Sequence, residues 1–163
     1  MAPNLAVISI PAYYLLSVVP HSFALNIACG GDISKFDNRN PRSSTYIAGL
    51  KEKLSPEQFA KFERCESAHK NNLESFPLFA SAVFVGLLAD GVGKGGILTG
   101  KSVSAETLRF VYSFLAVRLA YNVAYVTTRR NKYTLLRSGL WVAGLALVGE
   151  QFYRAAGILG EQL

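Results

Sequence analysis

The sequence predicts an all-α integral membrane protein, with four helices packed as a bundle in one domain that covers residues 1–163. The first observation is composition: 50% of the residues are hydrophobic, only 17% are charged, and the mean hydropathy is +0.23. Soluble domains usually carry about a quarter charged residues. The second observation is that apolar runs long enough for the roughly 30 Å hydrocarbon core recur along the chain. The third is that polar or breaker-rich segments separate these runs.

The first predicted helix covers residues 4–30. Residues 4–31 contain no Lys, Arg, Asp or Glu, and this run exceeds the roughly 20 residues that a membrane span needs. No basic segment precedes the run, so we expect a retained span and not a cleaved signal peptide. Pro11 and Pro20 lie inside it, where membrane helices tolerate proline better than soluble helices do.

The second predicted helix covers residues 56–89. Its apolar part, residues 75–89, is too short to span alone, but the polar segment 61–74 upstream contains no helix breaker. We therefore expect one long helix whose polar half projects at one membrane face. Pro77 is expected to kink this helix without ending it.

The third and fourth predicted helices cover residues 103–128 and 133–159. Charged side chains lie inside both, including Arg109 and Arg118 in the third helix and Arg137, Glu150 and Arg154 in the fourth. Charged groups within a span are costly and usually face a protein interior or a wet cavity. These residues therefore point to a polar interior or a site.

The connections between the helices predict the topology. The first and third connections carry most of the basic residues: Lys35, Arg39, Arg42, Lys51, Lys53, Arg129, Arg130 and Lys132. The positive-inside rule then places both connections in the cytosol and both termini on the opposite side. The net charge of +6 is thus largely a topology signal. Because no stacking aromatic residues are interleaved with these bases, we expect no nucleic-acid partner.

Two other chemistries are excluded on sequence grounds. Residues 95–102, GGILTGKS, match the phosphate-loop pattern, but no magnesium-binding Asp follows and the segment joins two predicted spans. It is therefore expected to be a flexible connection. His69 has no second His or carboxylate at metal-ligand spacing, and Cys29 and Cys65 form no zinc motif, so no metal site is predicted.

Polar side chains follow one stripe on the second helix and another on the third. The second-helix stripe comprises Arg64, Ser67, Asn71 and Glu74, with His69 and Lys70 beside it, and the third-helix stripe comprises Arg118, Tyr121 and Tyr125. Facing stripes would form a pocket with bases for carboxylates, amides for a peptide-like group, and tyrosine hydroxyls. The alternative is that these residues form buried ion pairs and hydrogen bonds between helices, for example Glu74 with Arg118.

The second-helix segment FERCESAHKNNLESFPLF, residues 62–79, resembles the signature of the MAPEG family, the membrane-associated proteins of eicosanoid and glutathione metabolism. The residues that carry the resemblance are Arg64, Asn71, Glu74 and Pro77. RCESAHKNNLE is especially similar to the microsomal glutathione transferases and prostaglandin E synthase of that family. RLAYNVAY, residues 118–125, resembles its third-helix signature, and RRNKYT, residues 129–134, resembles the segment that begins with its thiolate-stabilising arginine.

This resemblance implies a homotrimer in the endoplasmic reticulum membrane, with glutathione bound between neighbouring subunits towards the cytosol. It implies glutathione-binding roles for Arg64, His69, Lys70, Asn71, Glu74, Arg118, Tyr121, Tyr125 and Tyr133. Arg129 would hold the sulfur as a thiolate. Because the link from Tyr125 is shorter than in the prostaglandin synthase, Arg130 is a second candidate for that role.

Three functions follow from the resemblance. The first is a glutathione transferase or peroxidase that uses an arginine-stabilised thiolate on lipophilic electrophiles from the bilayer. The second is a glutathione-dependent isomerase in a lipid or natural-product pathway. The third is a non-catalytic lipid-binding membrane protein, but the family's member of that kind lacks the thiolate arginine. Ser67 and Lys70 stand where relatives often have arginine, and Tyr121 stands where one synthase has histidine, so the second substrate is left open.

Overall fold

The computed structural model describes residues 3–93 and 103–161, and every regular element within them is helical. The longer helices are α1 (Leu5–Ala28), α2 (Ser44–Lys53), α3 (Pro56–Gly93), α4 (Ala105–Thr127) and α5 (Thr134–Gly160). Two single-turn helices, η1 (Ile33–Lys35) and η2 (Asn131–Tyr133), lie in the connections. The all-α prediction is therefore confirmed for the described residues, and the phosphate-loop match at 95–102 lies outside them.

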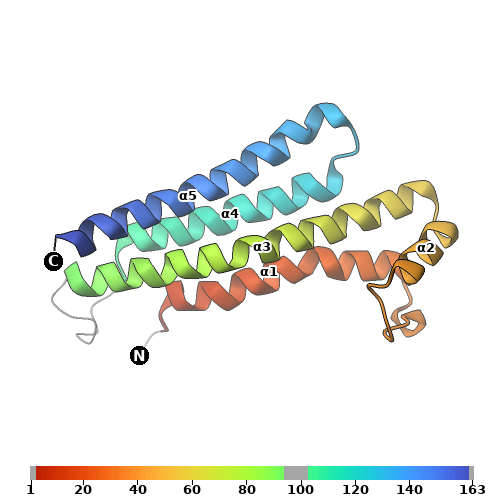
Figure 1. Ribbon diagram of the computed structural model, residues 1–163, viewed down its shortest axis with the longest axis horizontal. Coiled ribbons are helices and arrows are strands. Elements are labelled where there is room, and N and C mark those ends of the chain that lie inside the picture. Colours follow the sequence, from red (N-terminus) through yellow and green to blue (C-terminus); the bar gives the residue numbers. More distant parts are fainter. Residues whose placement is uncertain (1–2, 94–102, 162–163) are drawn as a thin grey trace.

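Four long helices, α1, α3, α4 and α5, lie side by side along the molecule (Figure 1). The start of α1, the end of α3, the start of α4 and the end of α5 lie at one end. The connection from α1 to α3, with α2 in it, and the turn from α4 to α5 lie at the other, which we call the α2 end (Figure 1). Helix α3 packs along α1, α4 and α5, so its faces decide what the chain can gather into one site.

Proline does not break the long helices. Helix α1 passes through Pro11 and Pro20, and α3 continues through Pro77 as one element of 38 residues. Asn4 starts α1, because its side-chain oxygen accepts from the backbone N–H groups of Ala6 and Val7. The expectation of a single long second helix with a polar first half is therefore confirmed.

Helix α2 was not predicted, because it lies in the polar, breaker-rich connection between the first two predicted helices. The Ser43 hydroxyl caps it by accepting from the N–H of Tyr46 at 3.1 Å. Leu50 is 4% exposed and packs with Phe59 and Phe62 in a small apolar cluster. Tertiary packing of one leucine, more than local propensity, holds this short polar helix in place.

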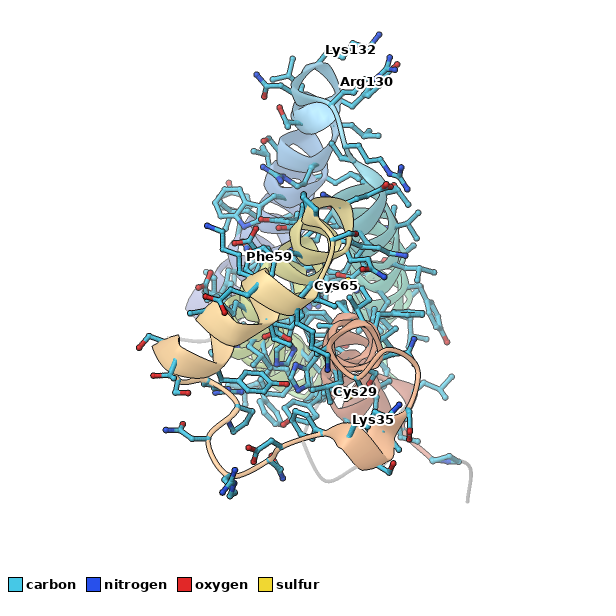
Figure 2. The ribbon with its side chains drawn as sticks, turned by 90° about the vertical axis from the view of Figure 1, so that its right-hand side faces the viewer. Cys29, Lys35, Phe59, Cys65, Arg130 and Lys132 are labelled. Atoms are coloured by element: carbon cyan, nitrogen blue, oxygen red, sulfur yellow. The ribbon has the colours of Figure 1, made fainter. Side chains whose placement is uncertain are left out.

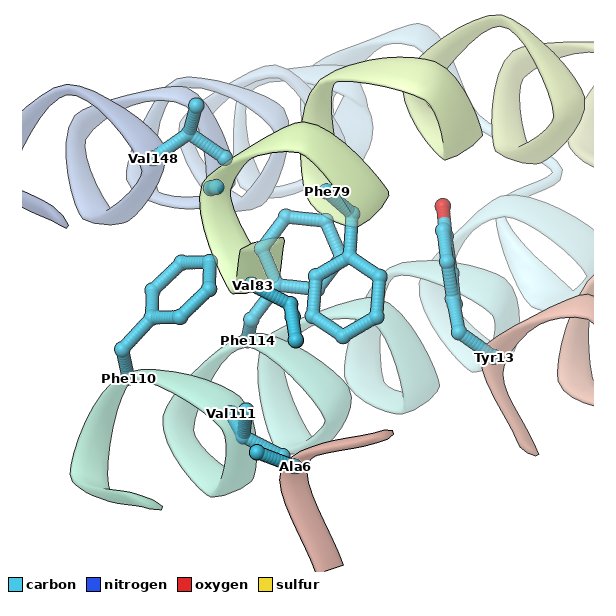
Figure 3. Close-up of a cluster of buried hydrophobic side chains, with 9 residues drawn as sticks. Ala6, Tyr13, Phe79, Val83, Phe110, Val111, Phe114 and Val148 are labelled. Atoms are coloured by element: carbon cyan, nitrogen blue, oxygen red, sulfur yellow. The ribbon is translucent and has the colours of Figure 1, made fainter. Parts of the chain in front are cut away.

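Aromatic rings fill the main core between α1, α3, α4 and α5 (Figure 3). The Phe79 and Phe114 rings stack with centroids 4.6 Å apart, and Tyr13 meets Phe79 edge-on at 5.1 Å. The outer surface is also apolar: Leu15 and Phe84 are 67% and 59% exposed. An apolar exterior around an aromatic core is typical of helices that pack together in lipid.

Three helices in the described part of the chain are long and apolar enough to cross a membrane: α1, α3 over Pro56–Val92, and α4. Helix α5 is not one of them, since Arg137, Glu150 and Arg154 interrupt its apolar sequence. The prediction of four spans is thus supported by length and composition for three of them.

Candidate functional site

Helix α3 divides the predicted site residues between two sides. Arg64 and Asn71 lie towards α4, where Arg64 Nε donates to the Val126 carbonyl at 3.2 Å. His69 lies towards α1, with Nδ1 2.7 Å from the Ser17 carbonyl. His69, which the sequence places beside the stripe, therefore faces a different helix from Arg64 and Asn71.

Arg118 is at the centre of the α4 side. It is 1% exposed, and its guanidinium donates to the Tyr13 hydroxyl at 2.9 Å, the Asn71 carbonyl at 2.9 Å and the Ser75 hydroxyl at 3.0 Å. All three acceptors are neutral. Arg118 thus joins α1, α3 and α4 and fixes the part of α3 that carries Asn71.

Two tyrosines continue from Arg118 along α4. Tyr121 is 2% exposed, and the Arg118 guanidinium lies over its ring at 4.6 Å. Tyr125 meets Tyr121 edge-on, and Arg137 of α5 lies over the Tyr125 ring at 4.2 Å. A pair of tyrosine rings with an arginine at each end therefore extends from the core towards the α2 end.

Glu74 and Lys70 are exposed on α3. The ion pair between Glu74 and Arg118 that we considered as an alternative is not formed among the described residues, because Arg118 uses Tyr13, Asn71 and Ser75 instead. Both Glu74 and Lys70 are therefore accessible to a ligand or to a second subunit.

A cavity of about 690 Å³ lies on the other side of α3, bounded by α1 and by residues 36–47. His69 and Lys70 line it, together with Arg42 and apolar residues such as Leu25 and Phe36. Pockets of this size accommodate drug-sized or tripeptide-sized ligands. Besides these apolar and basic side chains, the lining includes the acidic Glu63 and Glu66, so the cavity suits an amphipathic ligand that carries charges of both signs.

A histidine pair borders this cavity. His21 Nδ1 lies 2.6 Å from the Glu66 carboxylate, and the rings of His21 and His69 stack with centroids 5.0 Å apart. Because a carboxylate and a carbonyl can only accept, Nδ1 of each ring carries a hydrogen and Nε2 remains for other partners. The described residues contain no cluster of three or more potential metal ligands.

The other predicted residues lie near the turn from α4 to α5. Arg129, Arg130 and Tyr133 are all exposed, and Figure 2 shows Arg130 at the extremity of this turn, far from Lys35. An Arg129 nitrogen lies 2.5 Å from the Glu57 carboxylate at the start of α3, and both side chains are about two-thirds exposed, at 68% and 67%. A single chain therefore does not bring Arg129 into the cavity.

The first connection has its own electrostatics outside the helices. Two hydrogen bonds from the Arg39 guanidinium and one from the Arg39 backbone N–H lower the pKa of Asp37 to about 2. Hydrogen bonds from Ser34 lower the pKa of Asp32. Burial raises the pKa of Tyr46, which lines the cavity. At neutral pH both acids are charged and Tyr46 keeps its hydroxyl hydrogen.

The sequence prediction missed His21, Glu66, Arg42 and Arg137. His21 stands alone in an apolar run, and its partner Glu66 is 45 positions away. A spacing rule within one helix finds neighbours on that helix, so it cannot find a pair formed between α1 and α3.

These features define an integral membrane protein of long packed helices, with polar side chains gathered on both sides of α3 towards the α2 end. The sequence profile of the MAPEG family matches residues 5–157, nearly the whole chain, and the protein belongs to this family. Comparison with curated proteins and with solved structures finds no match. Membership of the family supports a membrane protein related to glutathione or eicosanoid metabolism.

Proposed function

We propose that the protein is a membrane-bound glutathione transferase, with peroxidase activity as a second outcome of the same thiolate chemistry. The family match supports glutathione as the substrate. The observation that carries the proposal is the set of polar residues on α3. The segment resembling the family motif carries exposed Lys70, which lines the cavity of about 690 Å³, and exposed Glu74 one helical turn further on. The Lys70 ammonium suits a carboxylate of the tripeptide glutathione, and the Glu74 carboxylate suits the amino group of glutathione.

The site is proposed to form between subunits of a homotrimer. In one chain, His69 and Lys70 border the cavity, whereas Arg64 and Asn71 lie towards α4. One glutathione cannot contact both sets within one copy, because α3 itself lies between them. A neighbouring copy that offers its other side would complete the site. Native mass spectrometry in detergent should show a trimer, and a monomer with full activity would rule out a site between subunits.

Arg129 is proposed to stabilise the thiolate. Its partner in the single chain, Glu57, is about two-thirds exposed, and exposed ion pairs contribute only about 0–1 kcal/mol. Exchanging Glu57 for a thiolate therefore costs little. Lowering a thiol pKa by about two units requires roughly 2.7 kcal/mol of preferential anion stabilisation, which one arginine in a partly dry site can supply.

The proposed topology has four spans across the endoplasmic reticulum membrane, with the α2 end on the cytosolic side. Helix α5 is included because it packs along both α3 and α4. A cysteine introduced at Ser43 tests this, and the native Cys29 and Cys65 give low background because they are 3% and 0% exposed. An impermeant thiol reagent should label Ser43→Cys from the cytosolic side of sealed microsomes, and lumenal labelling would reverse the topology.

The function is tested on the purified protein with glutathione and a panel of electrophiles and lipid hydroperoxides. Arg129→Leu should leave glutathione affinity mostly intact and remove the ultraviolet thiolate absorbance and most turnover, about tenfold per 1.36 kcal/mol lost. Arg130→Leu, in the same turn, is the matched control. If Arg130→Leu alone removes the thiolate, Arg130 is the thiol partner.

The wild-type assay also separates the three functions. If the wild type forms no thiolate and turns over no substrate, the lipid-binding function is favoured. Isomerisation without conjugation favours the isomerase.

A further inference from the structure

The Glu66–His21 pair has the arrangement of an oriented acid–base group. The carboxylate holds Nδ1 at 2.6 Å, and the stacked His69 ring, itself fixed by the Ser17 carbonyl, limits rotation of the imidazole. Among the described residues, no hydrogen bond engages Nε2 of His21. A carboxylate that holds one ring nitrogen and stabilises the imidazolium leaves the other nitrogen ready to exchange a proton.

The position of the pair is as informative as its geometry. The side chains of His21 and Glu66 are 29% and 20% exposed, and both border the large cavity. Leu25, Phe36 and Ile47 also line this cavity, and residues 36–47 reach it because α2 and the preceding loop fold against α1 and α3. A lipophilic molecule held by these apolar side chains would therefore share the cavity with the histidine.

The geometry points to His21 as a catalytic acid–base residue for a lipophilic second substrate whose oxygen takes up a proton, such as an epoxide. This inference rests on the proposed transferase function and adds a proton-donating residue to it. The glutathione sulfur attacks an epoxide carbon, so a C–S bond forms and the C–O bond breaks with its electron pair going to oxygen. Nε2–H of protonated His21 gives that oxygen its proton. Water returns to Nε2 the proton it gave up, and the next glutathione thiol releases its proton to water, so glutathione and epoxide combine into one hydroxy thioether.

Two electrophiles with different proton requirements test this assignment. Styrene oxide needs a proton on the oxygen that leaves carbon, whereas chlorodinitrobenzene releases chloride, which needs none. His21→Asn should lower kcat/KM for styrene oxide by about a hundredfold, the usual contribution of general acid–base catalysis. The same variant should change kcat/KM for chlorodinitrobenzene by less than about threefold, since thiolate formation is assigned to Arg129.

Glu66→Gln is the second variant, because it removes the charge that stabilises the imidazolium and changes the volume little. It should reduce the styrene oxide rate selectively but less than His21→Asn does, and Glu52→Gln on exposed α2 should change neither rate. Equal losses with both electrophiles, or no loss with either, would overturn the role of His21. A wild-type protein inactive on both electrophiles would overturn the transferase function and this assignment with it.

Discussion

Arg118 and Arg154 both lie inside long helices, but the structure satisfies their charges in different ways. Two nitrogens of Arg154 lie 3.2 Å from one oxygen of Asp90, and one of them also donates to Thr107 at 2.7 Å. Arg118 has only the neutral oxygens of Tyr13, Asn71 and Ser75 around it. One charge is neutralised by a carboxylate and the other is balanced only by dipoles.

The difference separates a structural end of the molecule from the end where the glutathione site is proposed. The second oxygen of Asp90 accepts from the N–H of Ser104 at 3.0 Å, so this network joins α3, α5 and the residue that caps α4. A network of this kind has no charge left for a ligand. Arg118 leaves positive charge next to Asn71, where an anionic ligand at the α2 end would benefit from it.

The largest predicted effect comes from breaking the network around Asp90 and Arg154. Arg154→Met leaves Asp90, whose side chain is 7% exposed, without its cation. Removing one partner of a buried ion pair costs about 3–5 kcal/mol, and we expect that loss in the free energy of unfolding measured in detergent. Adding Asp90→Asn should recover most of it, because no buried charge then remains. If Arg154→Met alone is as stable as the wild type, water must hydrate the Asp90 carboxylate in the folded protein.

Arg118→Met should cost less, about 1–2 kcal/mol, although Arg118 is the more deeply buried residue. Its partners keep other bonds: the Tyr13 hydroxyl donates to the Asn72 carbonyl at 3.0 Å, and the Ser75 hydroxyl donates to the Asn71 carbonyl at 2.9 Å. Removing the arginine therefore leaves no donor unpaired. The same unfolding measurement checks this, and a loss as large as that of Arg154→Met would contradict the comparison.

Glu74→Gln tests the functional end without touching the core. Glu74 is exposed and forms no ion pair within residues 3–93 and 103–161, so the unfolding temperature should stay unchanged. Loss of a charge-assisted hydrogen bond to glutathione should weaken its affinity about tenfold, or about 1.4 kcal/mol, by calorimetric titration. Glu106→Gln on α4, at the opposite end, is the control. If the trimer dissociates instead, Glu74 is a residue of the subunit contact.

Much of the fold could be predicted, because long apolar runs constrain a membrane protein strongly. The absence of charge in residues 4–31 and the missing breaker in 61–74 were enough to place α1 and α3 within a few residues. Helix α2 was missed because its stability comes from burying Leu50 against residues distant in sequence. Its local sequence, STYIAGLKEK, is too short and polar to give a helical signal of its own.

The candidate site was predicted less completely than the fold. The stripe through Arg64 and Asn71 was derived from helical periodicity, which orders residues on one helix but does not say which neighbour each will meet. The structure directs His69 towards α1 and Asn71 towards α4. Pairing between helices depends on packing over the whole chain, and therefore the His21–Glu66 pair was found only in three dimensions.

The smallest predicted effect concerns an ion pair of the same type as Asp90–Arg154 but in water. The Arg39 guanidinium donates to both oxygens of Asp37, at 2.9 and 2.8 Å, and lowers the pKa of Asp37 from 3.8 to about 2. A lowered folded-state pKa adds stability above the ordinary pKa and loses it as the pH falls towards 2. Because both groups are exposed, solvent screens the pair. Arg39→Gln should therefore return the Asp37 pKa towards 3.8 in a carbon NMR titration, with no change in unfolding temperature at neutral pH. A fall in that temperature comparable to the effect of Arg154→Met would show that burial is not what distinguishes the two pairs.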